Sequence, residues 1–297
     1  ALLQCLERVM FACKHLSYIM QYPLKHVMMV LCTKLGFHIA TVCKNNSCFI
    51  SSEQADYLVD LASSFLSLGI KSDVTSVRLK LCGLGLEHRN HDLTEVCLQT
   101  ISDPWMRYMY SVTLDVKHPV SEVYCNIKSY FEKLLTKRYS TEELLQTQAS
   151  FNVLYMPSEI AITPTPLRME MFRSVGTPSM SRDEELHSWY DWCVIDSLIC
   201  LHFFQYIYFS RQGKLRNRQV AMDNMINVIR TEPIICHRDT AFNILGYSFM
   251  QENKLINAFL CFTQSMKIRP HHNSAKFYLG LLFKRVLVTQ KERTLLK

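Results

Sequence analysis

A leucine-glycine-x-x-phenylalanine pattern occurs twice near the end of the chain, thirty-four residues apart. The two copies consist of Leu245, Gly246 and Phe249 and of Leu279, Gly280 and Phe283. Self-similarity at a fixed period of this length is typical of repeat architectures, in which one supersecondary unit cannot bury its hydrophobic face alone. Such units must stack on their neighbours, so this part of the chain is predicted to form an array.

Two amphipathic helices are predicted within one repeat, which begins at Asp239. Apolar residues at helical spacing form one face of each helix: Ile244, Leu245 and Phe249 on the first, and Ala258, Cys261 and Phe262 on the second. Residues 251–253 supply a short polar turn between them, and Pro270 ends the second helix. Gly246 and Ala258 are small and let two backbones approach closely. We therefore predict that Gly246 lies where the two helices cross.

These positions resemble those of the tetratricopeptide-repeat (TPR) family. The residues at the characteristic offsets of that family are Phe242, Leu245, Gly246, Phe249, Ala258, Phe262 and Pro270, whereas Ser265 stands where alanine is more usual. The resemblance covers about residues 239–285. It implies an α-solenoid of helical hairpins, a TPR-like superhelix, whose concave groove is lined by the first helix of each repeat and holds a partner peptide or helix.

The resemblance also places residues in that groove by position. They are Thr240, Asn243, Tyr247, Met250, Gln251, Ser274, Phe277, Leu281, Lys284 and Arg285. Some family members grip the C-terminal carboxylate of chaperones with Lys and Asn, but Asn243 and Tyr247 stand at those positions here. A groove that contains Tyr247, Phe277 and Leu281 is better suited to an amphipathic helix or an apolar peptide.

The scarcity of helix breakers favours an all-α fold for the whole chain. Only 8 Gly and 9 Pro occur in 297 residues, of which 48% are hydrophobic. A doubly wound or barrel enzyme would need glycine-rich connections and continuous β-branched runs, and the sequence has neither. We predict an α-solenoid of helical hairpins with divergent N-terminal repeats and essentially no strand.

The predicted organisation has three parts: a divergent helical-repeat region over 1–151, an extended insertion over 152–181 and TPR-like repeats over 182–297. Helices are expected at about 1–21, 24–43, 52–68, 72–88, 92–101, 104–116, 119–137 and 141–151, and a long one at 182–212. Residues 57–86 are consistent either with a decayed repeat or with an ordinary helical pair. In the insertion, Pro157, Pro164, Pro166 and Pro178 push their preceding residues toward extended geometry.

The insertion allows two interpretations. Its apolar residues, such as Leu154 and Phe172, favour a loop packed across the solenoid. Its Thr-Pro dipeptides, which begin at Thr163, Thr165 and Thr177, could instead be substrates of a proline-directed kinase.

The basic residues leave nucleic-acid binding as an alternative function. The formal net charge is +7, with acidic residues interspersed. The densest clusters are Arg211, Lys214, Arg216 and Arg218, and then Lys284, Arg285, Lys291 and Arg293. Nucleic-acid modules usually concentrate their charge more than this. Solvated basic loops are the commoner explanation, and a steep fall of affinity with salt would indicate the alternative.

No constellation of catalytic or metal-binding residues emerges from the sequence. The only glycine-rich run, residues 81–85, lacks the preceding strand and the third glycine that a phosphate loop requires. His38, Cys43 and Cys48 are the only close His/Cys set, without the four ligands and Cys-x2-Cys pair of a structural zinc site. We predict no catalytic residue, metal or cofactor.

The twelve cysteines lie mostly inside apolar helical runs, where thiols behave as small hydrophobes, so all are predicted to be reduced. The two most apolar segments, 27–43 and 193–209, are shorter than a membrane span. Together these features predict an intracellular, non-catalytic scaffold or adaptor that binds other proteins within a multi-subunit complex.

Overall fold

The computed structural model describes residues 32–33, 35–43, 45–46, 49–69, 75–101, 110–112, 149–176, 191–231, 235 and 237–295. The chain divides into two compact units. The first comprises residues 1–153 and 158–163, and the second comprises residues 154–157 and 164–297. Each unit is described by itself.

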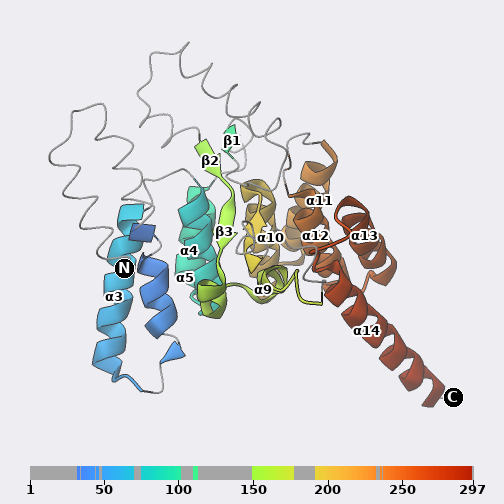
Figure 1. The fold of residues 1–297 in the computed structure, drawn as a ribbon, viewed down its shortest axis with the longest axis horizontal. Coiled ribbons are helices and arrows are strands. Elements are labelled where there is room, and N and C mark those ends of the chain that lie inside the picture. Colours follow the sequence, from blue (N-terminus) through green and yellow to red (C-terminus); the bar gives the residue numbers. More distant parts are fainter. Residues whose placement is uncertain are drawn as a thin grey trace, which may run out of the picture. The chain divides into compact units, whose positions relative to one another are not determined.

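The first unit contains a helix over residues 35–43 and the helices α3 (Ser52–Gly69), α4 (Ser76–Glu87) and α5 (His91–Thr100) (Figure 1). The helices α4 and α5 form a hairpin. Its turn is closed by Asn90, whose side chain accepts a hydrogen bond of 3.0 Å from the Leu93 amide and so caps α5. Gly85 lies against α5, because a Cβ there would be 2.6 Å from the Thr94 hydroxyl oxygen.

The core of the first unit contains an ion pair beside apolar side chains. Phe37, Leu66 and the Ile162 side chain of the 3₁₀ helix η1 (Pro157–Ile162) form one buried cluster. The Lys80 ammonium lies 2.6 Å from the Glu159 carboxylate and 4.6 Å from the centre of the Phe37 ring. A paired carboxylate and an aromatic face together compensate for burial of the lysine charge.

Two helical hairpins form most of the second unit. The first joins α10 (Ser197–Arg211) to α11 (Leu215–Thr231), and the second joins α12 (Arg238–Gln251) to α13 (Leu255–Ile268). Each turn uses one residue with a left-handed backbone, Gly213 with φ 67° and Asn253 with φ 57°. Glycine and asparagine tolerate that conformation best. The last helix, α14 (Ala275–Leu295), lies against α13 and α12 (Figure 1).

Close contact between α12 and α13 is centred on Gly246, as the sequence predicts. A Cβ on Gly246 would lie 2.5 Å from the Phe262 ring of α13, so only glycine fits there. The Phe262 ring is fully buried and stacks on the Tyr278 ring of α14, with 5.1 Å between centroids and 2° between planes. The ring that covers Gly246 is therefore held from its other side by α14.

The described residues are mainly helical, as predicted, and strand within them is limited to four segments of three residues each. Strand β1 (Tyr110–Val112) lies within the helix expected over 104–116, and β2 (Ala149–Phe151) ends the one expected over 141–151. These strands pair in parallel, with Tyr110 opposite Ala149. A second pair joins β3 (Val153–Tyr155) to β4 (Cys193–Ile195).

The strand β4 also corrects the long helix predicted over 182–212, because α10 begins only at Ser197. Residues 193–195 are a short, completely buried apolar run. Periodicity alone cannot distinguish such a run from a buried helix. Asp196 then fixes the junction, since its carboxylate accepts a hydrogen bond of 3.0 Å from the His237 amide before α12.

The insertion is more helical than its prolines suggest. Besides η1 it contains α9 (Thr165–Met171), which follows the N-cap residue Pro164 and has Pro166 in its first turn. Proline is well tolerated there, because the first helical amides have no intrahelical acceptor. Thr163 is completely buried and Thr165 is exposed, so of these two Thr-Pro dipeptides only the second is open to a kinase. Thr177 and the helices expected over 1–21 and 119–137 lie outside the described residues.

Candidate functional site

The structure divides the predicted groove residues into a buried and an exposed set. Asn243, Met250 and Ser274, and also Thr240, are buried, which corrects their assignment to an open groove. Tyr247 and Phe277 are half-buried, and Gln251, Leu281, Lys284 and Arg285 are exposed. Only the last six can meet a partner without rearrangement of the protein, and their role in binding stays a prediction.

Two residues of the buried set, Asn243 and Ser274, are hydrogen-bonded to the carboxylate of Glu170 in the same chain. The Nδ2 atom of Asn243 donates a hydrogen bond of 3.1 Å to Oε1 of Glu170 on α9, and the Ser274 hydroxyl donates another to the same oxygen. Asn243 Nδ2 also lies 2.9 Å from Ser274 Oγ. Two residues that the TPR resemblance placed in the groove therefore bind an internal acidic side chain.

Two buried acids and two arginines surround this contact. Arg173 is 2% exposed, and its Nη2 atom lies 3.7 Å from Oε2 of Glu170. Burial raises the pKa of Glu170, although the Arg173 charge and the hydrogen bonds from Ser274 and Asn243 oppose that rise. Burial would likewise raise the pKa of Asp239, but the net shift is downward because the charges of Arg269, at 2.7 Å, and of Arg173 outweigh it.

Three further contacts fasten residues 164–176, which we call the α9 segment, to the loop before α14 and to the start of that helix. The Tyr278 hydroxyl donates a hydrogen bond of 2.7 Å to the Pro166 carbonyl. His272 Nδ1 lies 3.0 Å from the Ser174 hydroxyl, and the Lys276 ammonium donates to the Val175 carbonyl. These partners are about a hundred residues apart in sequence, so no local pattern could indicate them.

Tyr247 is part of an internal aromatic cluster. Its ring lies edge-on to Phe203 of α10, at 6.3 Å, and to Tyr278 of α14, at 6.2 Å. Burial raises the pKa of the Tyr247 phenol. Because the ring joins three helices, its truncation would loosen the second unit, and loss of binding in such a variant would not by itself identify Tyr247 as a contact residue.

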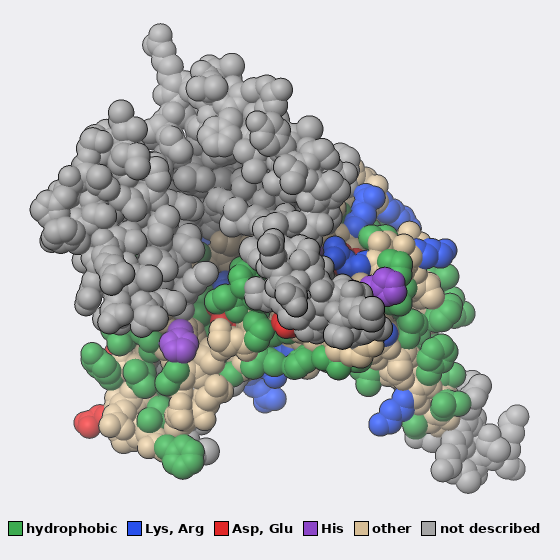
Figure 2. All heavy atoms as spheres, in the orientation of Figure 1, with side chains coloured by type: hydrophobic (Ala, Val, Ile, Leu, Met, Phe, Trp, Pro, Cys, Tyr) green, Lys and Arg blue, Asp and Glu red, His purple; other side chains and the backbone are tan. Residues whose placement is uncertain are grey.

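Apolar side chains gather on the exposed sides of α13 and α14 (Figure 2). On α13 they are Ile256, Phe259 and Leu260, and on α14 they are Leu281, Phe283, Leu287 and Val288, with exposed fractions between 40% and 76%. The Phe259 and Phe283 rings meet edge-on with 6.4 Å between centroids. We define the α13–α14 face as Ile256, Phe259, Gly280, Phe283 and Leu287. Exposed apolar patches of this kind commonly mark interaction sites.

The basic residues are partly engaged within the protein. Arg218 lies 2.9 Å from the Glu252 carboxylate in the turn after α12. Arg285 donates a hydrogen bond of 2.6 Å to the Met250 carbonyl. Lys214, Arg216 and Lys284 are exposed. Among the side chains that the structure describes, two of these five charges are thus bonded within the protein, whereas nucleic-acid modules present a concentrated basic surface.

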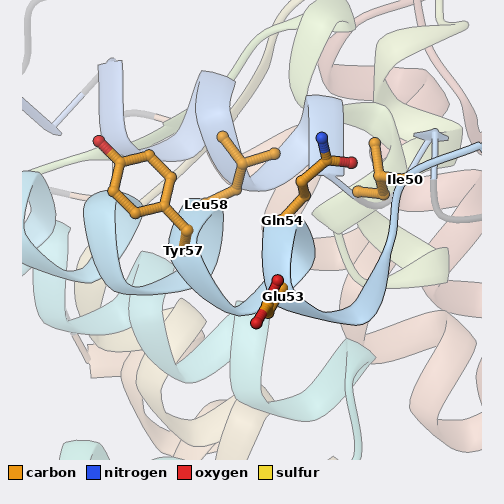
Figure 3. Close-up of a pocket in the computed structure, with 5 residues that line it drawn as sticks. All are labelled: Ile50, Glu53, Gln54, Tyr57 and Leu58. Carbon is orange, nitrogen blue, oxygen red and sulfur yellow. The ribbon is translucent and has the colours of Figure 1, made fainter.

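Two hollows lie among the described residues. An open depression of about 570 Å³ on α3 is lined by Ile50, Glu53, Gln54, Tyr57 and Leu58 (Figure 3). A second, of about 270 Å³, is lined by Gln205, Phe209, Arg216, Asn217, Val220, Ala221 and Asn224. In the first, the Glu53 carboxylate and the Tyr57 hydroxyl point in different directions, whereas covalent catalysis requires a nucleophile paired with a base (Figure 3).

Within the same described ranges, no three His, Cys, Asp or Glu side chains are grouped to hold a metal ion. His38 is exposed, Cys43 lies 3.8 Å from the Ala55 carbonyl, and Cys48 is outside the described residues. None of the described helices combines the length and hydrophobicity needed to cross a membrane. No protein-family model, curated protein or solved structure matches the chain.

The buried thiols provide a testable property of the fold. Burial raises the pKa of Cys97 to about 11 and that of Cys261 to about 12. Since the thiolate is the reactive form, we expect both to react slowly with iodoacetamide at pH 8 in the native protein and rapidly in urea. Mass spectrometry of digests would locate the alkylated residues. Fast native labelling of Cys261 would contradict the packing of α13 against α12.

Proposed function

We propose that the chain is a non-catalytic, intracellular scaffold or adaptor of TPR-like helical hairpins, which binds a partner helix or peptide as part of a multi-protein complex. The contact between Gly246 and Phe262 is the observation that carries this proposal. It is the close helix crossing that the family pattern requires at its glycine position. The same pattern continues into α14, where Leu281 and Lys284 are exposed and available to a partner.

The hairpin before α12 supports a solenoid in the second unit. The helices α10 and α11 are joined by a turn over residues 212–214, and α11 lies against α12. Ala221 and Met225 are buried on α11, as Ala258 and Phe262 are on α13. A solenoid consists of successive hairpins that bury equivalent positions against their neighbours.

The partner that fits the groove is an amphipathic helix or an apolar peptide with an acidic group. Phe277 and Leu281 offer apolar surface, while Lys284 and Arg285 offer positive charge. The hydrogen bonds of Asn243 and Ser274 to Glu170 support a preference of the proposed groove for a carboxylate. A partner that reached these two residues would have to displace the α9 segment.

The groove can be tested once a partner has been captured with the intact protein and identified. Leu281→Asp combined with Lys284→Glu should weaken binding at least tenfold, because the apolar contact and the charge attraction are both lost. Both side chains are exposed, so circular dichroism should be unchanged. Val220→Asp on α11 is a matched control, since Val220 is 51% exposed outside the groove. Undiminished binding by the double variant would place the contact elsewhere.

A further inference from the structure

The outward side of α14 is unusually apolar for a helix that faces water. Its exposed residues up to position 288 are Gly280, Leu281, Phe283, Lys284, Arg285, Leu287 and Val288. Only two of these seven are charged. A surface helix normally presents charged and polar residues to solvent. This side of α14 therefore has the composition of a surface that another element covers.

The α12–α13 pair provides an internal template for that element. On α12, the Phe262 ring covers Gly246, and Phe249 is only 8% exposed. Thirty-four residues later, a Cβ on Gly280 would have no atom within 4 Å, and Phe283 is 55% exposed. The position beside α14 that corresponds to α13 beside α12 is therefore open.

The chain does not turn back to fill this position within α14. In the first repeat, residues 252–254 form the turn that leads into α13. The corresponding residues 286–288 are Val, Leu and Val, and α14 continues through them to Leu295. The sequence pattern of the repeat thus stops after its first helix, although the apolar positions that would receive a second helix are present.

Charge identifies the kind of helix that fits. The helix α13 and the part of α14 up to position 288 contain no Asp or Glu, and the exposed Lys267 lies eleven residues, or about three turns, from Ile256 and so on the same side of α13. An acidic helix would be attracted to this surface. A second copy of the chain would instead bring the same positive charges together.

We propose that the α13–α14 face docks an acidic amphipathic helix of a partner protein, with an aromatic side chain over Gly280 as Phe262 lies over Gly246. This surface is distinct from the groove, because Phe283 and Leu281 point to different sides of α14: they are two residues apart on a helix, about 200° around its axis. The docked helix also contacts Phe259, whose ring already meets Phe283. The partner helix occupies the position beside α14 that α13 occupies beside α12.

A peptide copied from α13 provides a direct test. The probe has the sequence of residues 255–268, with three exposed residues changed to glutamate: Asn257→Glu, Lys267→Glu and Ile268→Glu. A staple joins positions 260 and 264, because so short a helix is only marginally stable in water. Fluorescence anisotropy should show saturable binding to the full chain. A peptide with Phe262→Ala should bind at least tenfold more weakly, and so should one with lysine in place of the three glutamates.

Variants of the protein separate this face from the groove. Phe283→Asp should weaken the acidic peptide at least tenfold, and Gly280→Leu should do the same by filling the space for the aromatic ring. Leu281→Asp is the matched control for Phe283→Asp, because it adds the same negative charge on the groove side of α14, and it should leave peptide binding within about twofold. The two proposals are tested with different ligands, the groove with the captured partner and the α13–α14 face with the peptide. Failure of the groove proposal would therefore leave the peptide result unchanged.

Three outcomes would overturn the proposal. The first is absence of saturable binding by the acidic peptide, and the second is equal binding by the acidic and lysine peptides. The third is self-association of the chain in sedimentation experiments that Phe283→Asp abolishes, which would assign the face to a second copy. Circular dichroism of each variant would establish that the helices are intact.

Discussion

Arg173→Met should destabilise the protein by about 3 kcal/mol, because removal of one partner from a buried charge pair leaves the other charge uncompensated. Arg173 is 2% exposed, and its guanidinium lies beside Glu170 and lowers the pKa of Asp239. Methionine has a similar apolar stem but no charge. Urea unfolding at neutral pH would measure the loss.

The pH dependence of this loss provides a second measurement. Without Arg173, the folded-state pKa of Glu170 should rise further above its unfolded value. A carboxyl group with a raised folded pKa is penalised only once the unfolded state can ionise, so the deficit should be small below about pH 4 and should grow as the pH rises. Loss of the Arg173 charge near Asp239 should change stability with pH in the same direction. A carboxyl group with a lowered folded pKa stabilises the fold only above its unfolded pKa, so this part of the deficit also grows as the pH rises.

Two controls make the interpretation specific. Arg216→Met removes an exposed cation from α11 and should change stability by no more than about 0.5 kcal/mol. Glu170→Gln combined with Arg173→Met removes both charges of the pair and should recover part of the stability lost in the single variant. If Arg173→Met alone were neutral, the Arg173 charge would not stabilise the buried carboxylates of Glu170 and Asp239.

The α12–α13 hairpin could be predicted from sequence because its signals are local. Helical periodicity, the polar turn and Pro270 all lie within one repeat, and the small Gly246 indicates the close crossing. The same local signals predict the bounds of α3, α4 and α5 to within a few residues. Burial of an equivalent face in each helix is sufficient to specify elements of this kind.

The buried site around Glu170 could not be predicted, because its partners are distant in sequence. Asn243 and Glu170 are 73 residues apart, and Ser274 and Glu170 are 104 apart. The family pattern gives the direction in which Asn243 and Ser274 point from their helices. It does not indicate that another segment of the same chain lies there. The one local signal is an acid between two apolar neighbours, Met169 and Met171.

Prolines and short apolar runs account for the errors in secondary structure. Pro164 and Pro166 predict extended structure, yet they stand at the start of α9, where proline is compatible with helical geometry. Residues 193–195 satisfy the helical pattern as well as the strand pattern, and pairing with β3 decides between them. In both cases a contact outside the local sequence determines the conformation.

The two glycines of the repeated pattern should respond in opposite ways to the same substitution. Gly246→Ala should destabilise the protein by about 1–3 kcal/mol, because the new Cβ would lie 2.5 Å from the Phe262 ring. That ring cannot withdraw freely, since its other face stacks on Tyr278. Gly280→Ala should stabilise by about 0.5–1 kcal/mol, because alanine favours helix and a Cβ there meets nothing within 4 Å.

Thermal and urea unfolding of the two variants would measure this difference. Each variant is the control for the other, since both glycines occupy the same position in the repeat and lie within α12 and α14. Helix propensity alone would make both substitutions favourable, so a loss confined to Gly246→Ala isolates the steric contact with α13. Stabilisation by both would contradict the close crossing of α12 and α13, and with it the basis for a TPR-like hairpin. Destabilisation by both would indicate that an element already covers Gly280, and the α13–α14 face would then not be open to a partner helix.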